Sequence, residues 1–183
     1  AQAVGARSGG RRIGELAPTS TLSFYPAKNL GALGDGGAIL TNSSEVASRL
    51  RKLRNYGSDT KYVHEVVGYN SRLDELQAAF LRAKLNCLPR WNERRAQVAT
   101  QYTEGLAPSK LTLPRVAKDV ESSWHLYVVQ STNRDRFMEL MAERGVQTQI
   151  HYPVAPHQQA AYSQRGPFNL PRTEALSQRV VSL

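Results

Sequence analysis

Apolar side chains recur along the chain with two kinds of spacing, and each kind predicts a type of secondary structure. Short runs of apolar and β-branched residues predict strands, and they fall at 21–25, 37–42, 124–129 and 146–150. Apolar residues spaced by three and four predict amphipathic helices, and these fall at 44–54, 70–87, 91–106 and 135–144. The mixture of both types predicts an α/β protein.

The segment from Asn70 to Cys87 has the clearest helical pattern. One buried face is expected, made of Leu73, Leu76, Phe80, Ala83 and Cys87. Ser71 and Asp74 match a capping box. Asn70 would then stand just before the helix start, where unpaired N–H groups favour a phosphate. Its alternative role is that of a capping residue only.

The run Leu88-Pro89-Arg90 interrupts the helical pattern, and a second helix is expected from Trp91 to Leu106. Capping residues delimit two other helices: Ser43 or Ser44 begins 44–54, and Asn133 or Thr132 begins 135–144, which Gly145 ends. We therefore predict a first domain over 1–88, a linking helix and boundary over 89–110, and a smaller α+β domain over 111–183.

Composition narrows the classes of function. The chain has 183 residues, of which 40% are hydrophobic, and no run is long enough to span a membrane. There is no signal-peptide pattern and only one cysteine, Cys87, so a cytoplasmic protein is expected. The net charge of +9 favours anionic partners such as phosphorylated cofactors, nucleotide-linked substrates or nucleic acid. No His, Cys, Asp or Glu cluster has metal-ligand spacing, which predicts no metal site.

Lys28 is the residue with the most distinctive local context. It follows the apolar strand 21–25 and Pro26, in a loop bounded by glycines. A lysine held beside a core strand has low-dielectric surroundings in which a neutral amine becomes a usable nucleophile. The alternative is a solvated surface charge. The loop is not a nucleotide-binding P-loop, since no Gly-Lys-Ser or Gly-Lys-Thr is present.

Several motifs in order along the chain carry a resemblance to a known family. The longest run is Ser23-Phe24-Tyr25-Pro26-Ala27-Lys28-Asn29-Leu30-Gly31, and Gly34-Asp35-Gly36-Gly37-Ala38 follows it. Further matches are Arg54-Asn55-Tyr56-Gly57, Gly68 to Glu75 and His151-Tyr152-Pro153. Together they resemble the DegT/DnrJ/EryC1/StrS family of pyridoxal-phosphate-dependent nucleotide-sugar aminotransferases. The resemblance implies the C-terminal part of the large domain of a fold type I enzyme, followed by a truncated small α+β domain.

The resemblance also implies roles for individual residues. Lys28 matches the lysine that forms a Schiff base with pyridoxal 5′-phosphate and then moves a proton between substrate and cofactor. Ser23 and Asn70 match phosphate-binding residues, with Asn70 reaching across a homodimer interface into a shared active site. Gln2 would lie near the cofactor ring, with the family's ring-binding aspartate just before Ala1.

A third group of residues borders the substrate in the family. This implies sugar contacts for Tyr25, Lys61, His64, His151 and Tyr152. His125, in a predicted strand, is assigned a structural role. The implied reaction transfers an amino group, with glutamate the expected donor, to a keto group of a nucleotide-linked deoxysugar. The pattern from Lys61 to Asn70 favours the 3-keto position.

Both ends of the chain resemble cuts, so the sequence is interpreted as an internal fragment. Two alternatives to an active enzyme follow from the sequence. One is a non-catalytic basic module that binds nucleic acid, although no recognition helix or RNA-binding aromatic motif is present. The other is a fragment of the pyridoxal-phosphate fold that is inactive on its own.

Overall fold

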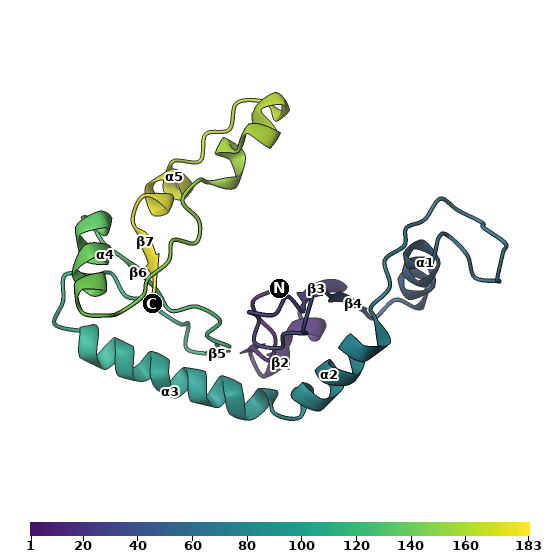
Figure 1. Ribbon diagram of the computed structural model, residues 1–183, viewed down its shortest axis with the longest axis horizontal. Coiled ribbons are helices and arrows are strands. Elements are labelled where there is room, and N and C mark those ends of the chain that lie inside the picture. The colour runs from purple at the N-terminus through teal and green to yellow at the C-terminus, as the bar shows by residue number, and fades with distance from the viewer. The chain divides into compact units, whose positions relative to one another are not determined.

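The computed structural model describes residues 1–183, and Figure 1 gives the order of its elements. Helices and strands are mixed along the chain, which confirms the predicted α/β class. The chain divides into two compact units, residues 1–97 with 116–125 and residues 98–115 with 126–183. The sequence-based domain limits stay a prediction. None of the helices combines the length and the hydrophobicity that spanning a lipid bilayer requires.

The first unit contains two small antiparallel sheets. One has the strand order β2-β1-β5, formed by Arg11–Arg12, Arg7–Ser8 and Val120–Glu121. The turn between β1 and β2 is Gly9-Gly10, and both glycines have positive φ (53° and 76°), as a tight two-residue hairpin requires. A short 3₁₀ helix, Ile13–Glu15, leads into the second sheet.

The second sheet is the hairpin of β3 (Thr19–Ser23) and β4 (Gly37–Thr41), in a register that pairs Ser23 with Gly37. Helices α1 (Ser44–Arg54) and α2 (Glu75–Leu85) follow, as does the first part of α3 (Leu88–Leu106). A single buried cluster forms the core of this unit: Val4, Phe24, Leu30, Ala32, Leu81 and Leu88. The strands and helices thus meet around the segment that follows β3.

The second unit is built on a short antiparallel pair, β6 (Val128–Gln130) and β7 (Val180–Ser182). Val129 and Val181 are fully buried in it. The remainder of α3 belongs to this unit. So do α4 (Arg134–Glu143), α5 (Pro171–Ser177) and two 3₁₀ helices, Pro156–Gln158 and Ala160–Arg165.

Helix α2 corrects the sequence prediction in its start and in its buried face. It begins at Glu75 because the Asp74 side chain accepts hydrogen bonds from the N–H groups of Leu76 and Gln77. Asn70 and Ser71 are not helical: Asn70 forms a bridge with Asn55, and Ser71 N–H donates to the Arg54 carbonyl. The capping box between Ser71 and Asp74 is therefore wrong, and Asn70 does not stand at the helix start.

The buried face of α2 runs through Gln77, Leu81 and Lys84. Of the predicted residues, Leu73 and Cys87 are partly buried but lie outside the helix, and the other three are exposed. Leu76 and Phe80 are 71% and 46% exposed. Helix α3 starts at Leu88 rather than Trp91, with Pro89 in its first turn, where a missing N–H costs no helical hydrogen bond. The helical pattern is interrupted at Asn86-Cys87 instead.

The predicted strands of the smaller domain are also shorter than expected. Trp124 has φ +45°, which an extended strand does not allow. Of the predicted 124–129 region only Val128 and Val129 are in a strand, β6. In 146–150 only Gln149 pairs, with Ser182, because the N–H of Val146 closes the end of α4 on the Met141 carbonyl. The caps of two helices are confirmed: Ser43 caps α1 and Asn133 caps α4.

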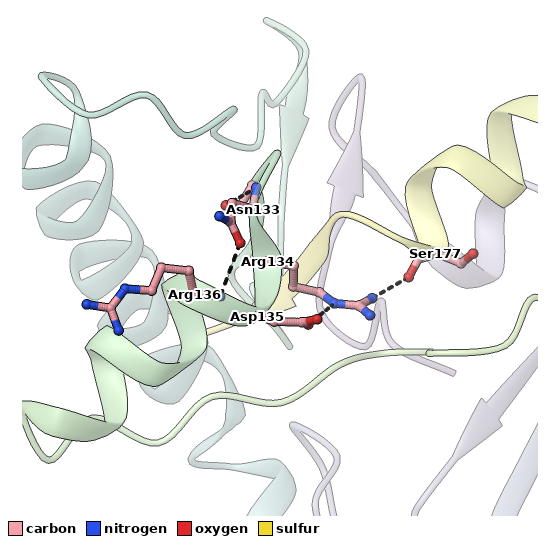
Figure 2. Close-up of polar contacts among 6 residues, drawn as sticks. Asn133, Arg134, Asp135, Arg136 and Ser177 are labelled. Atoms are coloured by element: carbon pink, nitrogen blue, oxygen red, sulfur yellow. Dashed lines mark hydrogen bonds and ion pairs between the residues drawn. The ribbon is translucent and has the colours of Figure 1, made fainter.

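Figure 2 shows how the start of α4 is fastened to the end of α5. The Asn133 side chain accepts from the N–H of Arg136, and the Arg134 guanidinium donates to the Ser177 carbonyl at 2.6 Å. That carbonyl belongs to the last residue of α5, where helical carbonyls lack partners within the helix. Arg134 is largely buried (16% exposed side chain), whereas Arg136 is 54% exposed.

We expect Arg134→Met to lower the free energy of unfolding of the protein by about 1–3 kcal/mol, because it leaves a buried carbonyl without its charged donor. Urea unfolding measures the change. Arg136→Met is the matched control, and a surface change of this kind should stay within about 0.5 kcal/mol of the parent. Equal effects of the two substitutions would contradict the proposed fastening.

Candidate active site around Lys28

The segment after β3 is a compact loop anchored at both ends by the main chain of Phe24. The Phe24 N–H donates to the Gly36 carbonyl at 2.8 Å, and the Phe24 carbonyl accepts from the Ala32 N–H at 2.7 Å. Phe24, Leu30 and Ala32 are buried in the core of the first unit. The loop is thus closed at its base, and its position does not depend on the side chains at its tip.

Gly31 is required by the tightness of this loop. A Cβ atom at this position would lie 2.2 Å from the Pro26 carbonyl oxygen, a backbone atom that cannot move aside alone. The Gly31 carbonyl in turn accepts from the Lys84 ammonium of α2 at 2.6 Å. The glycine that bounds the motif therefore allows the chain to double back immediately behind Lys28.

Asn29 fixes the loop from the inside. Its side chain is buried (7% exposed) and its amide nitrogen donates to the Asn92 side chain at 2.8 Å and to the Ser123 carbonyl at 2.6 Å. The residue next to Lys28 is thereby held to α3 and to the segment 116–125 of the same unit. A buried amide with both donors used resists displacement, because breaking either bond leaves a polar group unpaired.

Lys28 is half-buried and forms no ion pair with a carboxylate. Its N–H donates to the Tyr25 carbonyl at 2.8 Å, which closes a turn at the tip of the loop. Its Nζ lies 3.5 Å from Nε2 of His125, a contact that is long for a hydrogen bond but within reach of one. The Lys28 nitrogen therefore lies beside a histidine ring nitrogen and forms no salt bridge.

Three other predicted site residues belong to the same unit as this loop. Two of them are close to Lys28 in the sequence, and the third is linked to the loop by hydrogen bonds. Ser23 is the last residue of β3, and its Oγ accepts from the Tyr25 N–H at 3.3 Å, which leaves its O–H free to donate. Gln2 is linked to the loop indirectly, through Ser123. The Gln2 carbonyl accepts from the Ser123 hydroxyl at 2.9 Å, and the Ser123 carbonyl accepts from Asn29 of the loop. Tyr25 is exposed at the loop tip.

Lys61, His64 and Asn70 lie in or at the end of the long loop that follows α1 in Figure 1. All three are exposed. The Lys61 ammonium stacks over the Tyr62 ring at 4.9 Å, and His64 Nδ1 lies 3.0 Å from the Tyr56 carbonyl. No contact in the structure joins these three residues to Lys28, so their roles stay predictions.

His151 and Tyr152 belong to the second unit. His151 Nδ1 lies 2.9 Å from the Ser182 hydroxyl on β7. The rings of His151 and Tyr152 pack edge to face, with their centroids 5.4 Å apart. Tyr152 is exposed. Their predicted contacts with a sugar stay predictions.

The first unit also contains a groove of about 660 Å³ between the β3–β4 hairpin and α1, lined by residues that include Leu22, Ile39 and Leu50. Lys28 does not line it, and its walls contain no His, Cys, Lys, Asp or Glu side chain. No group of three or more His, Cys, Asp or Glu side chains is placed to hold a metal ion. Of the groove and the Lys28 loop, the loop is the one that offers an amine for covalent attachment of a cofactor.

Sequence reasoning missed three members of the Lys28 site. His125 was assigned a structural role, yet its ring nitrogen is the nearest polar side-chain neighbour recorded for Lys28 Nζ. Asn29 and Asn92, which hold the loop, were not singled out. Asn29 could have been found from its place beside Lys28 in the motif. His125 lies 97 residues away along the chain, and no local pattern signals that contact.

Known proteins match this chain over its whole length. It is 50% identical over 186 residues to "Erythromycin biosynthesis sensory transduction protein EryC1" of Saccharopolyspora erythraea, covering 100% of this chain and 51% of that protein. It is 49% identical to a dTDP-3-amino-3,4,6-trideoxy-alpha-D-glucose transaminase of Streptomyces venezuelae, covering 49% of that protein. The chain therefore spans about half the length of these relatives.

Solved structures agree with the sequence matches. DesV of Streptomyces venezuelae, in complex with a ketimine intermediate, superposes with a TM-score of 0.96 at 49% identity, over 100% of this chain and 50% of that one. NtdA of Bacillus subtilis with the bound cofactor PMP gives 0.85 at 30% identity, over 93% and 42%. A DegT DnrJ EryC1 StrS aminotransferase from Brucella abortus gives 0.94 at 36% identity, over 100% of this chain and 50% of that one, and the predicted fold is confirmed.

The sequence profile of the DegT/DnrJ/EryC1/StrS aminotransferase family matches residues 1–183. The chain belongs to this family, as its motifs predict.

The loop that carries Lys61 and His64 is held to α1 by Lys52, and this contact depends on pH. A hydrogen bond from Lys52 Nζ to Glu65 at 2.6 Å, with Asp59 nearby at 3.8 Å, raises the pKa of Lys52 above its ordinary value of 10.5. Because the folded protein holds this proton more tightly, the stabilisation is complete below pH 10.5 and is lost as pH rises through the raised pKa.

We expect Lys52→Met to make the 58–70 loop more sensitive to limited proteolysis at pH 8, with the difference from the parent fading as the pH rises to 11 and beyond. Peptide mass spectrometry locates the cleavage sites. Arg49→Met, an exposed change on the same helix, should leave the loop as resistant as in the parent. A difference that persists undiminished at high pH would exclude the Lys52 ion pair as its cause.

Proposed function

We propose that the protein is a pyridoxal-phosphate-dependent aminotransferase that transfers an amino group to a keto group of a nucleotide-linked deoxysugar. The observation that carries the proposal is the Lys28 amine, which is half-buried, free of any carboxylate and fixed in a closed loop. The loop has the family's lysine motif, in a chain whose sequence matches the family over its whole length.

The donor groups around Lys28 suit pyridoxal 5′-phosphate. An amine without an ion pair is the group that an aldehyde requires. Ser23 has a hydroxyl proton left to donate to a phosphate oxygen, since its oxygen already accepts from the Tyr25 N–H. The structure of NtdA with bound PMP supports the same class of cofactor. The site would thus offer an amine to which the cofactor can attach and a hydroxyl that can donate a hydrogen bond to the cofactor phosphate.

Each residue of this chain has a distinct part in the proposed reaction. Lys28 would attach the cofactor through Nζ and, once released, would hold and move a proton at the same atom. Ser23 would bind the phosphate, with Asn70 reaching it across a homodimer interface. Gln2 would lie near the ring. The cofactor, when bound, supplies the electron-accepting ring on which amino transfer depends.

The substrate proposal rests on the relatives. The Streptomyces venezuelae transaminase, with 49% identity, is named for a 3-amino sugar linked to dTDP. This supports a nucleotide-linked 3-keto deoxysugar as acceptor, with glutamate as donor. Tyr25, Lys61, His64, His151 and Tyr152 are the residues proposed to contact the sugar. A cytoplasmic location stays a prediction.

We expect Lys28→Ala to lower the rate of amino transfer by roughly a thousandfold or more, because both the attachment point and the proton carrier are lost. Borohydride reduction of the parent protein with bound cofactor, followed by peptide mass spectrometry, should place a phosphopyridoxyl group on Lys28. Lys118→Ala, an exposed lysine change in the same unit, is the control and should retain both activity and the adduct. Normal amino transfer by Lys28→Ala, or an adduct on another lysine, would refute the assignment.

A further inference from the structure

We propose that His125 is a positioning residue for the Lys28 amine, and that a directed chain of hydrogen bonds through Asn29 and Asn92 fixes it in one tautomer. The inference rests on the proposed function, because it concerns how the amine that attaches the cofactor is held. All of the residues involved lie in the first unit.

The chain of hydrogen bonds starts from two backbone carbonyls, which can only accept. The Val4 carbonyl lies 3.0 Å from one side-chain polar atom of Asn92, so that atom must be the amide nitrogen. The amide oxygen of Asn92 therefore faces Asn29. The Ser123 carbonyl lies 2.6 Å from the same Asn29 atom that faces Asn92 at 2.8 Å. That atom has two acceptors around it, so it must be the NH₂ group.

The orientation of Asn29 in turn fixes the tautomer of His125. With its NH₂ group facing Asn92 and Ser123, Asn29 presents its amide oxygen to His125 Nδ1 at 3.1 Å. An amide oxygen cannot donate, so Nδ1 must carry the proton. In a neutral imidazole the other nitrogen, Nε2, then carries a lone pair and can only accept.

The Nε2 lone pair faces Lys28. Nζ lies 3.5 Å from Nε2, so the lysine donates and the imidazole accepts, whether Lys28 is an amine or an ammonium. No proton is transferred between Lys28 and His125 in this contact. His125 acts by restricting the positions that Nζ can occupy. Contacts of this kind are often long in the free enzyme and tighten during the reaction.

The backbone of His125 is held as well. The guanidinium of Arg95 on α3 donates to the Trp124 carbonyl at 3.2 Å and to the His125 carbonyl at 3.4 Å. Ring and backbone are therefore fixed by separate groups. A lysine side chain loses rotamer freedom when it is held in this way, and that loss occurs before a substrate binds.

The first test measures the tautomer directly. In the whole protein labelled with ¹⁵N in its histidines, long-range proton–nitrogen correlation spectra identify which ring nitrogen carries the proton, and His125→Gln identifies the His125 signals by their loss. At a pH where the ring is neutral, we expect the proton on Nδ1. A neutral His125 with its proton on Nε2 would overturn the inference, and this result requires no activity.

The second test measures how well Lys28 is held. We expect His125→Phe, which keeps the ring but has no acceptor, to slow borohydride trapping of pyridoxal 5′-phosphate on Lys28 by roughly tenfold. His125→Gln can offer an amide oxygen to Nζ and should recover most of the rate. His157→Phe removes a histidine paired with Glu174 in the other unit and should leave trapping unchanged.

The outcomes separate the two proposals. Trapping of Lys28 at the parent rate in His125→Phe, measured on protein that unfolds cooperatively, would overturn the role of His125. A parent protein that forms no adduct at Lys28 would refute the proposed function instead, and the tautomer measurement would still judge the hydrogen-bond chain. Should His125→Phe fail to fold, His125→Gln and the tautomer measurement decide the question.

Discussion

The two hydrogen bonds donated by the buried Asn29 amide are the contacts on which the site depends. They join the loop after β3 to α3 and to the segment that precedes β6, three parts of the chain that are far apart in sequence. The apolar core around Phe24 and Leu30 holds the base of the same loop but has no directional preference. Apolar burial therefore places the loop, and the amide sets the orientation of its tip.

The residues that stabilise the loop are different from the residue proposed to react. Phe24, Leu30 and Ala32 are buried, and Gly31 permits the close approach to Pro26, yet none of them offers a reactive group. Lys28 lies between Phe24 and Leu30 in the sequence, is half-buried and has no carboxylate partner. A salt bridge at this position would hold the side chain but would also keep its nitrogen protonated and occupied. A histidine that accepts from Nζ through a ring nitrogen restricts the side chain without that cost.

The local parts of the fold could be predicted from the sequence, and the long-range parts could not. Helices 44–54 and 135–144 were predicted within one residue, because their caps are side chains next to the helix. The start of α2 was misplaced because the backbone of Asn70 and Ser71 pairs with the end of α1, a contact that no periodicity reveals. Lys28 stood out through its motif, whereas His125 is joined to it only by folding.

A row of hydrogen bonds runs from Lys28 through His125, Asn29 and Asn92 to the Val4 carbonyl. Each bond in the row has its donor on the lysine side and its acceptor on the Val4 side. Asn29 donates one further bond, to the Ser123 carbonyl. Such an array has a polarity, like a row of aligned dipoles. Rotating any single amide by half a turn would set like poles against each other on both sides of it. The array is consequently stable only as a whole, so a substitution at Asn92 would be felt at the lysine nitrogen without touching it.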